Sequence, residues 1–128
     1  MILLDTCALI WLASDASSLS RRARAAIEVP TARLCCSATS AWEVGIAHKR
    51  ARLELAGDPR IWFAGVVRKY RVRVIDVSWQ IAMASTQLPR HHHDPADRII
   101  VATALVHEVR IVSPDPEMPR YSGVRMIW

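Results

Sequence analysis

The sequence of 128 residues lacks any apolar run long enough to cross a bilayer, because runs such as residues 99–106 fall far short of the roughly 20 residues a span needs. It also lacks the basic and apolar start of a signal peptide, since Asp5 stands in that region. The three cysteines, with Cys35 next to Cys36, form neither a disulfide framework nor a zinc-ligand spacing. We therefore expect a cytoplasmic protein with no membrane partner, whose cysteines are reduced core thiols.

Acidic residues are in the minority. Seventeen Lys and Arg face twelve Asp and Glu, which leaves a net charge of +5. This balance favours an anionic partner such as nucleic acid, an acidic protein or a membrane surface, although many small proteins are basic without such a partner. With 52% hydrophobic and 23% charged residues the composition excludes wholesale disorder. The length predicts one domain over residues 1–128.

Short apolar segments alternate with segments of helical character along the chain. The predicted strands are residues 1–4, 34–37, 72–77, 111–113 and 124–128, and the predicted helices are 6–13, 20–28, 39–50, 58–70, 79–88 and 94–107. This alternation indicates an α/β fold with a mainly parallel central sheet of four to five strands and helices on both faces. In such sheets functional groups collect at the carboxyl ends of the strands.

Two acidic residues directly follow predicted strands. Asp5 ends the first strand, and Asp115 lies just past the strand at residues 111–113. A carboxylate in this position is costly unless it is paired or bound to a cation, and the neighbours of Asp5 are Leu4 and Thr6. Several converging carboxylates repel one another, and a divalent metal is the usual compensation. Hard oxygen ligands select magnesium or manganese over zinc.

Two further acids stand near predicted helix starts at the same sheet edge. Glu43 is the third residue of its helix if Ser40 is the cap, and Asp97 is the third residue of its helix if Asp94 is the cap. A structural reading is open for both, because residues 40–43 fit a capping box and an acid in the first turn suits the helix dipole.

Four segments in this order resemble the PIN-domain ribonucleases over essentially the whole chain, and most closely the VapC-type toxins of bacterial toxin–antitoxin pairs. They are Leu-Leu-Asp-Thr at residues 3–6, Ser-Ala-Trp-Glu at 40–43, His-His-Asp-Pro-Ala-Asp-Arg opening 92–104, and Val-Ser-Pro-Asp at 112–115. Two features depart from the family pattern. Ala96 stands where many relatives have a bulky aromatic residue, and Pro114 and Pro116 flank Asp115.

The resemblance implies an endoribonuclease that hydrolyses RNA phosphodiester bonds with Mg²⁺ or Mn²⁺. By this resemblance Asp5 and Asp97 are the expected direct metal ligands, and Glu43 and Asp115 complete the catalytic acid set or hold a second ion. Because water rather than the ribose 2′-hydroxyl attacks, we expect a 5′-phosphate and a 3′-hydroxyl on the products.

Substrate contacts are predicted for four further residues, namely Thr6, His92, Arg98 and Ser113. Thr6 and Ser113 can hydrogen-bond phosphate or metal-bound water, or they can cap backbone groups. His92 can approach the phosphate or orient the turn at Asp94. Consecutive histidines at residues 91–93 cannot all face one metal ion from a regular element, so a transition-metal site is not expected there.

The resemblance also implies a cognate antitoxin protein and a homodimer, with residues 38–67 as the region that serves both. Two other functions remain open from the sequence. A non-catalytic nucleic-acid-binding regulatory module of the same fold would keep the acids for stability, and a nuclease for DNA or flap structures would use the same acids on another substrate.

Overall fold

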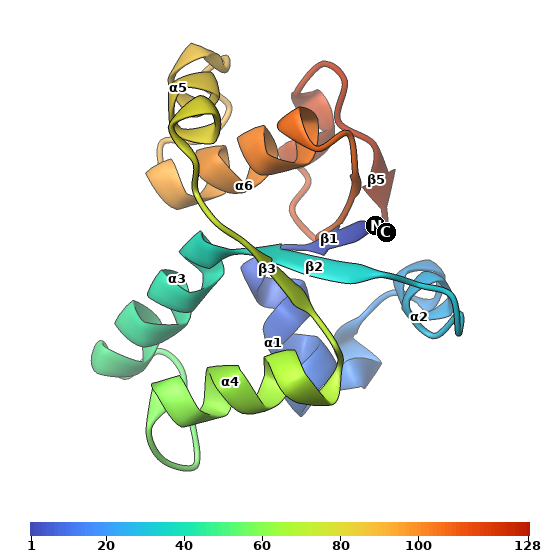
Figure 1. The fold of residues 1–128 in the computed structure, drawn as a ribbon, viewed down its shortest axis with the longest axis vertical. Helices are drawn as coiled ribbons and strands as arrows, with labels where there is room; N and C mark the ends of the chain where they lie inside the picture. Colours follow the sequence, from blue (N-terminus) through green and yellow to red (C-terminus); the bar gives the residue numbers. More distant parts are fainter.

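A computed structural model describes all residues from 1 to 128. Its centre is a five-stranded sheet that separates two groups of helices (Figure 1). The strands are β1 (Ile2–Leu4), β2 (Leu34–Ser37), β3 (Arg73–Ile75), β4 (Arg110–Val112) and β5 (Met126–Ile127). Every pairing is parallel, and the order across the sheet is β3-β2-β1-β4-β5. The predicted α/β architecture with a parallel sheet is confirmed.

Six helices surround the sheet. They are α1 (Thr6–Ser14), α2 (Arg21–Ile27), α3 (Ala38–Lys49), α4 (Pro59–Lys69), α5 (Trp79–Gln87) and α6 (Pro95–Val106). Short 3₁₀ turns at Ala16–Ser18 and Met118–Arg120 complete the chain. None of the helices combines the length and hydropathy that crossing a bilayer would require.

The sheet has a hydrophobic core on each face. Successive residues of a strand point to opposite faces and therefore pack into different cores. Leu4 and Cys36 belong to the core beneath α1, α2 and α4, whereas Leu3 and Cys35 belong to the core beneath α5 and α6. The adjacent cysteines therefore lie on opposite faces of the sheet and do not bridge. Cys7 is exposed on α1, so the prediction that all three are core thiols was wrong for this one.

The start of α3 differs from the predicted one. The hydroxyl of Ser37 accepts a hydrogen bond from the amide of Thr39 at 3.2 Å, and the helix begins at Ala38. Ser40 lies fully buried inside the helix, so Glu43 stands beyond the first turn. The capping-box interpretation of residues 40–43 was therefore wrong, and helix capping no longer explains Glu43. The predicted caps at Asp58 and Asp94 are confirmed.

The strand order places a switch point beside β1. From β1 the chain moves outward to β2 and β3 on one side, and later continues to β4 and β5 on the other side. Ligands of open parallel sheets bind at the carboxyl ends of the strands that flank such a point. Asp5 follows β1, and Ser113 and Asp115 follow β4.

Candidate active site

Asp5 joins the ends of β1 and β4. Its Oδ1 accepts a hydrogen bond from the amide of Ala8 at 2.7 Å and thereby caps α1, while its Oδ2 accepts one from the hydroxyl of Ser113. Burial raises the pKa of Asp5 to about 6, and the negative charges of Asp97 and Asp115 add to this effect although both hydrogen bonds oppose it. Asp5 is thus fixed by neutral donors and lacks a cationic partner.

Glu43 reaches the same edge from α3. The hydroxyl of Thr6 donates a hydrogen bond to Oε2 of Glu43, and the Oγ1 of Thr6 lies 2.9 Å from the hydroxyl oxygen of Ser40. Burial raises the pKa of Glu43 to about 7, and the charges of Asp97, Asp94 and Asp5 raise it further against the opposing bond from Thr6. Ser40 and Thr6 therefore position Glu43 among other carboxylates.

Asp97 occupies the first turn of α6, as predicted. Partial burial raises its pKa, and the charges of Asp94 and Asp115 raise it further, while His92 acts in the opposite direction. The charge of Asp97 raises the pKa of both Asp5 and Glu43, and the charge of Asp115 raises that of Asp5 and Asp97. The four acids therefore belong to one acidic cluster. The four acids come from both ends of the chain and from two helices between them.

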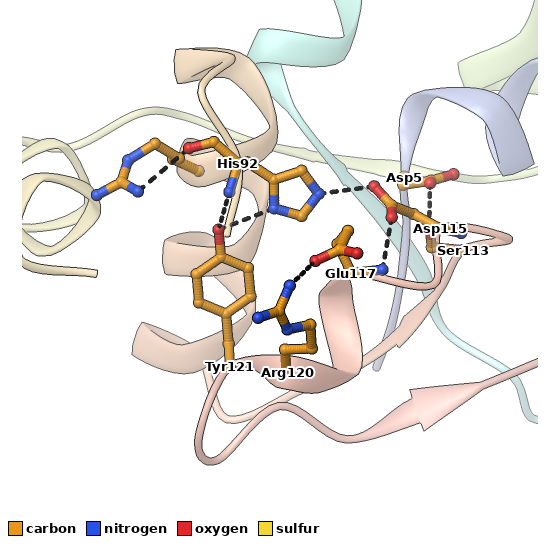
Figure 2. Close-up of polar contacts among 8 residues, drawn as sticks. Asp5, His92, Ser113, Asp115, Glu117, Arg120 and Tyr121 are labelled. Atoms are coloured by element: carbon orange, nitrogen blue, oxygen red, sulfur yellow. Dashed lines mark hydrogen bonds and ion pairs between the residues drawn. The ribbon is translucent and has the colours of Figure 1, made fainter. Parts of the chain in front are cut away.

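Asp115 is held by three hydrogen bonds beyond β4 (Figure 2). Its own amide donates to the hydroxyl of Ser113 at 3.1 Å, and its Oδ1 accepts from the amide of Glu117 at 2.8 Å. Its Oδ2 lies 2.7 Å from Nε2 of the buried His92. The carboxylate between the two prolines therefore has a defined orientation.

Tyr121 fixes the ring of His92 from the other side, as Figure 2 shows. The Tyr121 hydroxyl accepts a hydrogen bond from the backbone amide of His92 at 3.0 Å and lies 2.8 Å from its Nδ1. An ionised carboxylate only accepts hydrogen bonds, so Nε2 of His92 carries a proton that points at Asp115, and Nδ1 of a ring with that one proton accepts from the Tyr121 hydroxyl. Tyr121 was not predicted from the sequence, because it stands in an irregular loop without periodicity or motif.

Arg98 lies against the loop between α5 and α6. Its Nη2 donates to the carbonyl oxygens of Ser85 at 2.9 Å and Leu88 at 2.7 Å. Its Nη1 donates to the carbonyl oxygens of Pro89 at 2.9 Å and His92 at 3.4 Å. The guanidinium therefore closes the end of α5 and holds the loop that carries His92, and contact with RNA stays a prediction for this residue.

Comparison with known proteins identifies the family of this chain. The family model of the PIN domain matches residues 2–124. The chain belongs to the PIN-domain family. It is 31% identical over 127 residues to Ribonuclease VapC22 of Mycobacterium tuberculosis, covering 98% of this chain and 95% of that protein.

Solved structures share this PIN fold. The DNA-bound VapBC from Salmonella typhimurium matches with a TM-score of 0.70 and 23% identity over 98% of this chain and 95% of that chain. FitAcB from Neisseria gonorrhoeae matches with a TM-score of 0.69 and 19% identity over 100% of this chain and 97% of that chain. At these identities the similarity establishes the fold.

The donor set of this PIN domain fits a hard divalent cation. The cluster offers carboxylate oxygens and hydroxyls, and burial together with the neighbouring negative charges raises the pKa values of Asp5, Glu43 and Asp97. No three His, Cys, Asp or Glu side chains are arranged so that they could hold a metal ion by themselves. Mg²⁺ suits such an arrangement, because it retains several waters and binds through one or two carboxylates together with substrate phosphates.

Tyr121→Phe tests whether the PIN domain depends on the hydrogen-bond chain through His92. Loss of the hydroxyl leaves Nδ1 without its hydrogen-bond partner, so the ¹⁵N NMR signal of Nδ1 should shift, while Nε2 still faces Asp115. We expect catalytic activity or metal affinity to fall about tenfold to a hundredfold, as for other residues that orient metal ligands. Tyr70→Phe, which removes the hydroxyl of the tyrosine at the end of α4, is the control. An unchanged Nδ1 signal together with unchanged activity would contradict this role.

Proposed function

We propose that this PIN domain is a metal-dependent endoribonuclease, acting in the cytoplasm as the toxin of a type II toxin–antitoxin pair. The observation that carries the proposal is the convergence of Asp5, Glu43, Asp97 and Asp115 at the switch point of the sheet. The likeness to Ribonuclease VapC22 over almost the whole length of both chains supports RNA as the substrate.

Asp5 and Asp97 are the residues proposed to hold Mg²⁺ or Mn²⁺, with Glu43 and Asp115 completing the site. When bound, the cation supplies Lewis acidity and neutralises charge on the phosphate oxygens. Ser113 and the amide of Ala8 keep the two oxygens of Asp5 in place, and His92 does the same for Asp115.

Glu43 is the proposed proton acceptor. Burial raises the pKa of Glu43 to about 7 in the metal-free protein, and a bound cation would lower it, which would keep the carboxylate ionised and able to accept a proton. Thr6 orients the carboxylate through its hydrogen bond to Oε2. Attack by water would then leave a 5′-phosphate and a 3′-hydroxyl.

The proposed partners are a cognate antitoxin and a second copy of this chain. Relatives of the same fold include the toxin–antitoxin complex from Klebsiella pneumoniae, with a TM-score of 0.64, 24% identity and coverage of 97% of this chain and 95% of that chain. In this chain α3 and α4 flank a cavity of about 400 Å³ lined partly by Phe63 and Val67. Trp42 and Ile61 on the same helices are exposed, which supports residues 38–67 as the docking region.

Side-by-side digestion of single-stranded RNA, single-stranded DNA and a DNA flap in Mg²⁺, Mn²⁺ and EDTA tests the activity. We expect internal cleavage of RNA with either metal, 5′-phosphorylated products, and no cleavage in EDTA. Binding of RNA without cleavage would instead favour the non-catalytic regulatory module. Cleavage of DNA with intact RNA would favour a deoxyribonuclease.

A further inference from the structure

A cavity of about 360 Å³ opens between the end of α5 and the start of α6. Its lining contains no carboxylate and no large apolar side chain. Two arginines and two histidines contribute to it, namely Arg90, Arg98, His92 and His93. A polar cavity with this lining suits an anion, and the function proposed above does not use it.

The donors in this cavity differ in how far they are already engaged. The hydroxyls of Ser85 and Thr86 each donate to a backbone carbonyl of α5 at 2.7 Å. Both Nη atoms of Arg98 already donate hydrogen bonds to carbonyl oxygens at the end of α5 and in the following loop. These bonds neutralise the partial negative charge of the helix terminus, which would otherwise repel an anion.

Arg90 and His93 are the unengaged donors. Both are exposed, and neither takes part in any of the ion pairs of the structure. An arginine guanidinium matches the geometry of a phosphate and can donate two parallel hydrogen bonds to it. A ring nitrogen of His93 can supply another donor.

The cavity adjoins the acidic cluster through two shared features. His92 lines the cavity and places its Nε2 2.7 Å from Asp115. Pro95 lines the cavity as the first residue of α6, and Asp97 belongs to the same turn. An anion in the cavity is therefore separated from the acids by the His92 imidazole and one helical turn.

We infer that this cavity is a subsite for a backbone phosphate of the RNA strand, next to the bond that the acids cleave, with Arg90 and His93 as its donors. The inference rests on the proposed ribonuclease function. Converging carboxylates repel a polyanionic strand, so cationic groups beside them offset this repulsion and fix the strand on the protein.

Arg90→Ala tests the subsite by RNA binding without hydrolysis. Fluorescence anisotropy of a labelled single-stranded RNA is measured in EDTA over a range of KCl concentrations. We expect about tenfold weaker binding, the size of one charge-assisted hydrogen bond. The slope of log K against log salt should become shallower by about 0.7 for each phosphate that the variant no longer neutralises. Arg90→Lys retains the charge and should recover part of the affinity.

Arg22→Ala is the matched control, because it removes the same charge from an exposed position on α2, which lies on the other face of the sheet from α5 (Figure 1). Equal decreases in affinity in the two alanine variants would overturn the subsite, since they would report net charge alone. Unchanged RNA binding in Arg90→Ala would also overturn it, even if inorganic phosphate shifts the NMR signals of His93 in the unmodified protein.

The two proposals fail separately in these experiments. If RNA binding depends on Arg90 but no RNA is cut in Mg²⁺ or Mn²⁺, the ribonuclease function is contradicted, whereas phosphate binding in the cavity is still supported. If the unmodified protein and Arg90→Ala both cut RNA with the same KM, the subsite is contradicted and the ribonuclease function is supported.

Discussion

Asp97→Asn should lower RNA cleavage by about a thousandfold or more while the protein stays folded, because Asp97 is a proposed metal ligand and such a ligand contributes several kcal/mol to the stabilisation of the transition state. The side chain of Asp97 has a raised pKa from burial and from the charges of Asp94 and Asp115. The neutral amide is nearly the same size and relieves this repulsion. The metal-free variant should therefore unfold at the same temperature as the unmodified protein or a higher one.

Asp76→Asn is the matched control for this experiment, since Asp76 is an exposed acid beyond the end of β3. It should leave the cleavage rate unchanged. Cleavage is followed with Mn²⁺ on purified proteins whose folding is checked by circular dichroism. Full metal-dependent cleavage by folded Asp97→Asn would show that Asp97 is not needed at the site. Asp5→Asn provides the same test for the acid that follows β1.

The fold could be predicted because its signals are local. The strands consist mostly of apolar residues, and α4 and α6 begin with Asp-Pro pairs whose aspartates accept hydrogen bonds from the helix. The placement of Asp5 and Asp115 at one edge followed from parallel strands alone, since their carboxyl ends must lie together.

The details that sequence reasoning missed depend on contacts between distant residues. The local pattern allowed Ser40 to cap α3, but its burial beside Thr6, which is 34 positions earlier, leaves Ser37 as the cap. The role of Tyr121 depends on His92, 29 positions away. Helix and strand patterns relate only residues a few positions apart. They cannot predict these two contacts, because only tertiary packing brings the side chains together.

The metal-free protein should become less stable as the pH rises from about 4 to 7. The pKa of Asp5 rises from 3.8 to about 6 on folding and that of Glu43 from 4.5 to about 7, so the folded state binds more protons than the unfolded state in this window. The stability present below pH 4 is thus lost as the pH passes the folded pKa values. For Asp5 the loss is on the order of 3 kcal/mol, at about 1.4 kcal/mol per pKa unit.

Thermal unfolding in EDTA across this pH range measures the effect. Asp97→Asn should show a smaller decline, because one of the charges that raises the pKa values of both Asp5 and Glu43 is gone. A midpoint that rises steadily from pH 4 to pH 8 in the unmodified protein would contradict the raised pKa values.

Titration of Mn²⁺ at pH 8, followed by the unfolding midpoint Tm, tests most directly whether the four acids form one cation site. A cation that binds only the folded protein raises Tm in a saturable manner. We predict such a rise for the unmodified protein, a smaller one at pH 5 where Asp5 and Glu43 hold protons, and a loss of most of the rise in Asp97→Asn. An unchanged Tm in the unmodified protein, or equal rises in both proteins, would contradict the account.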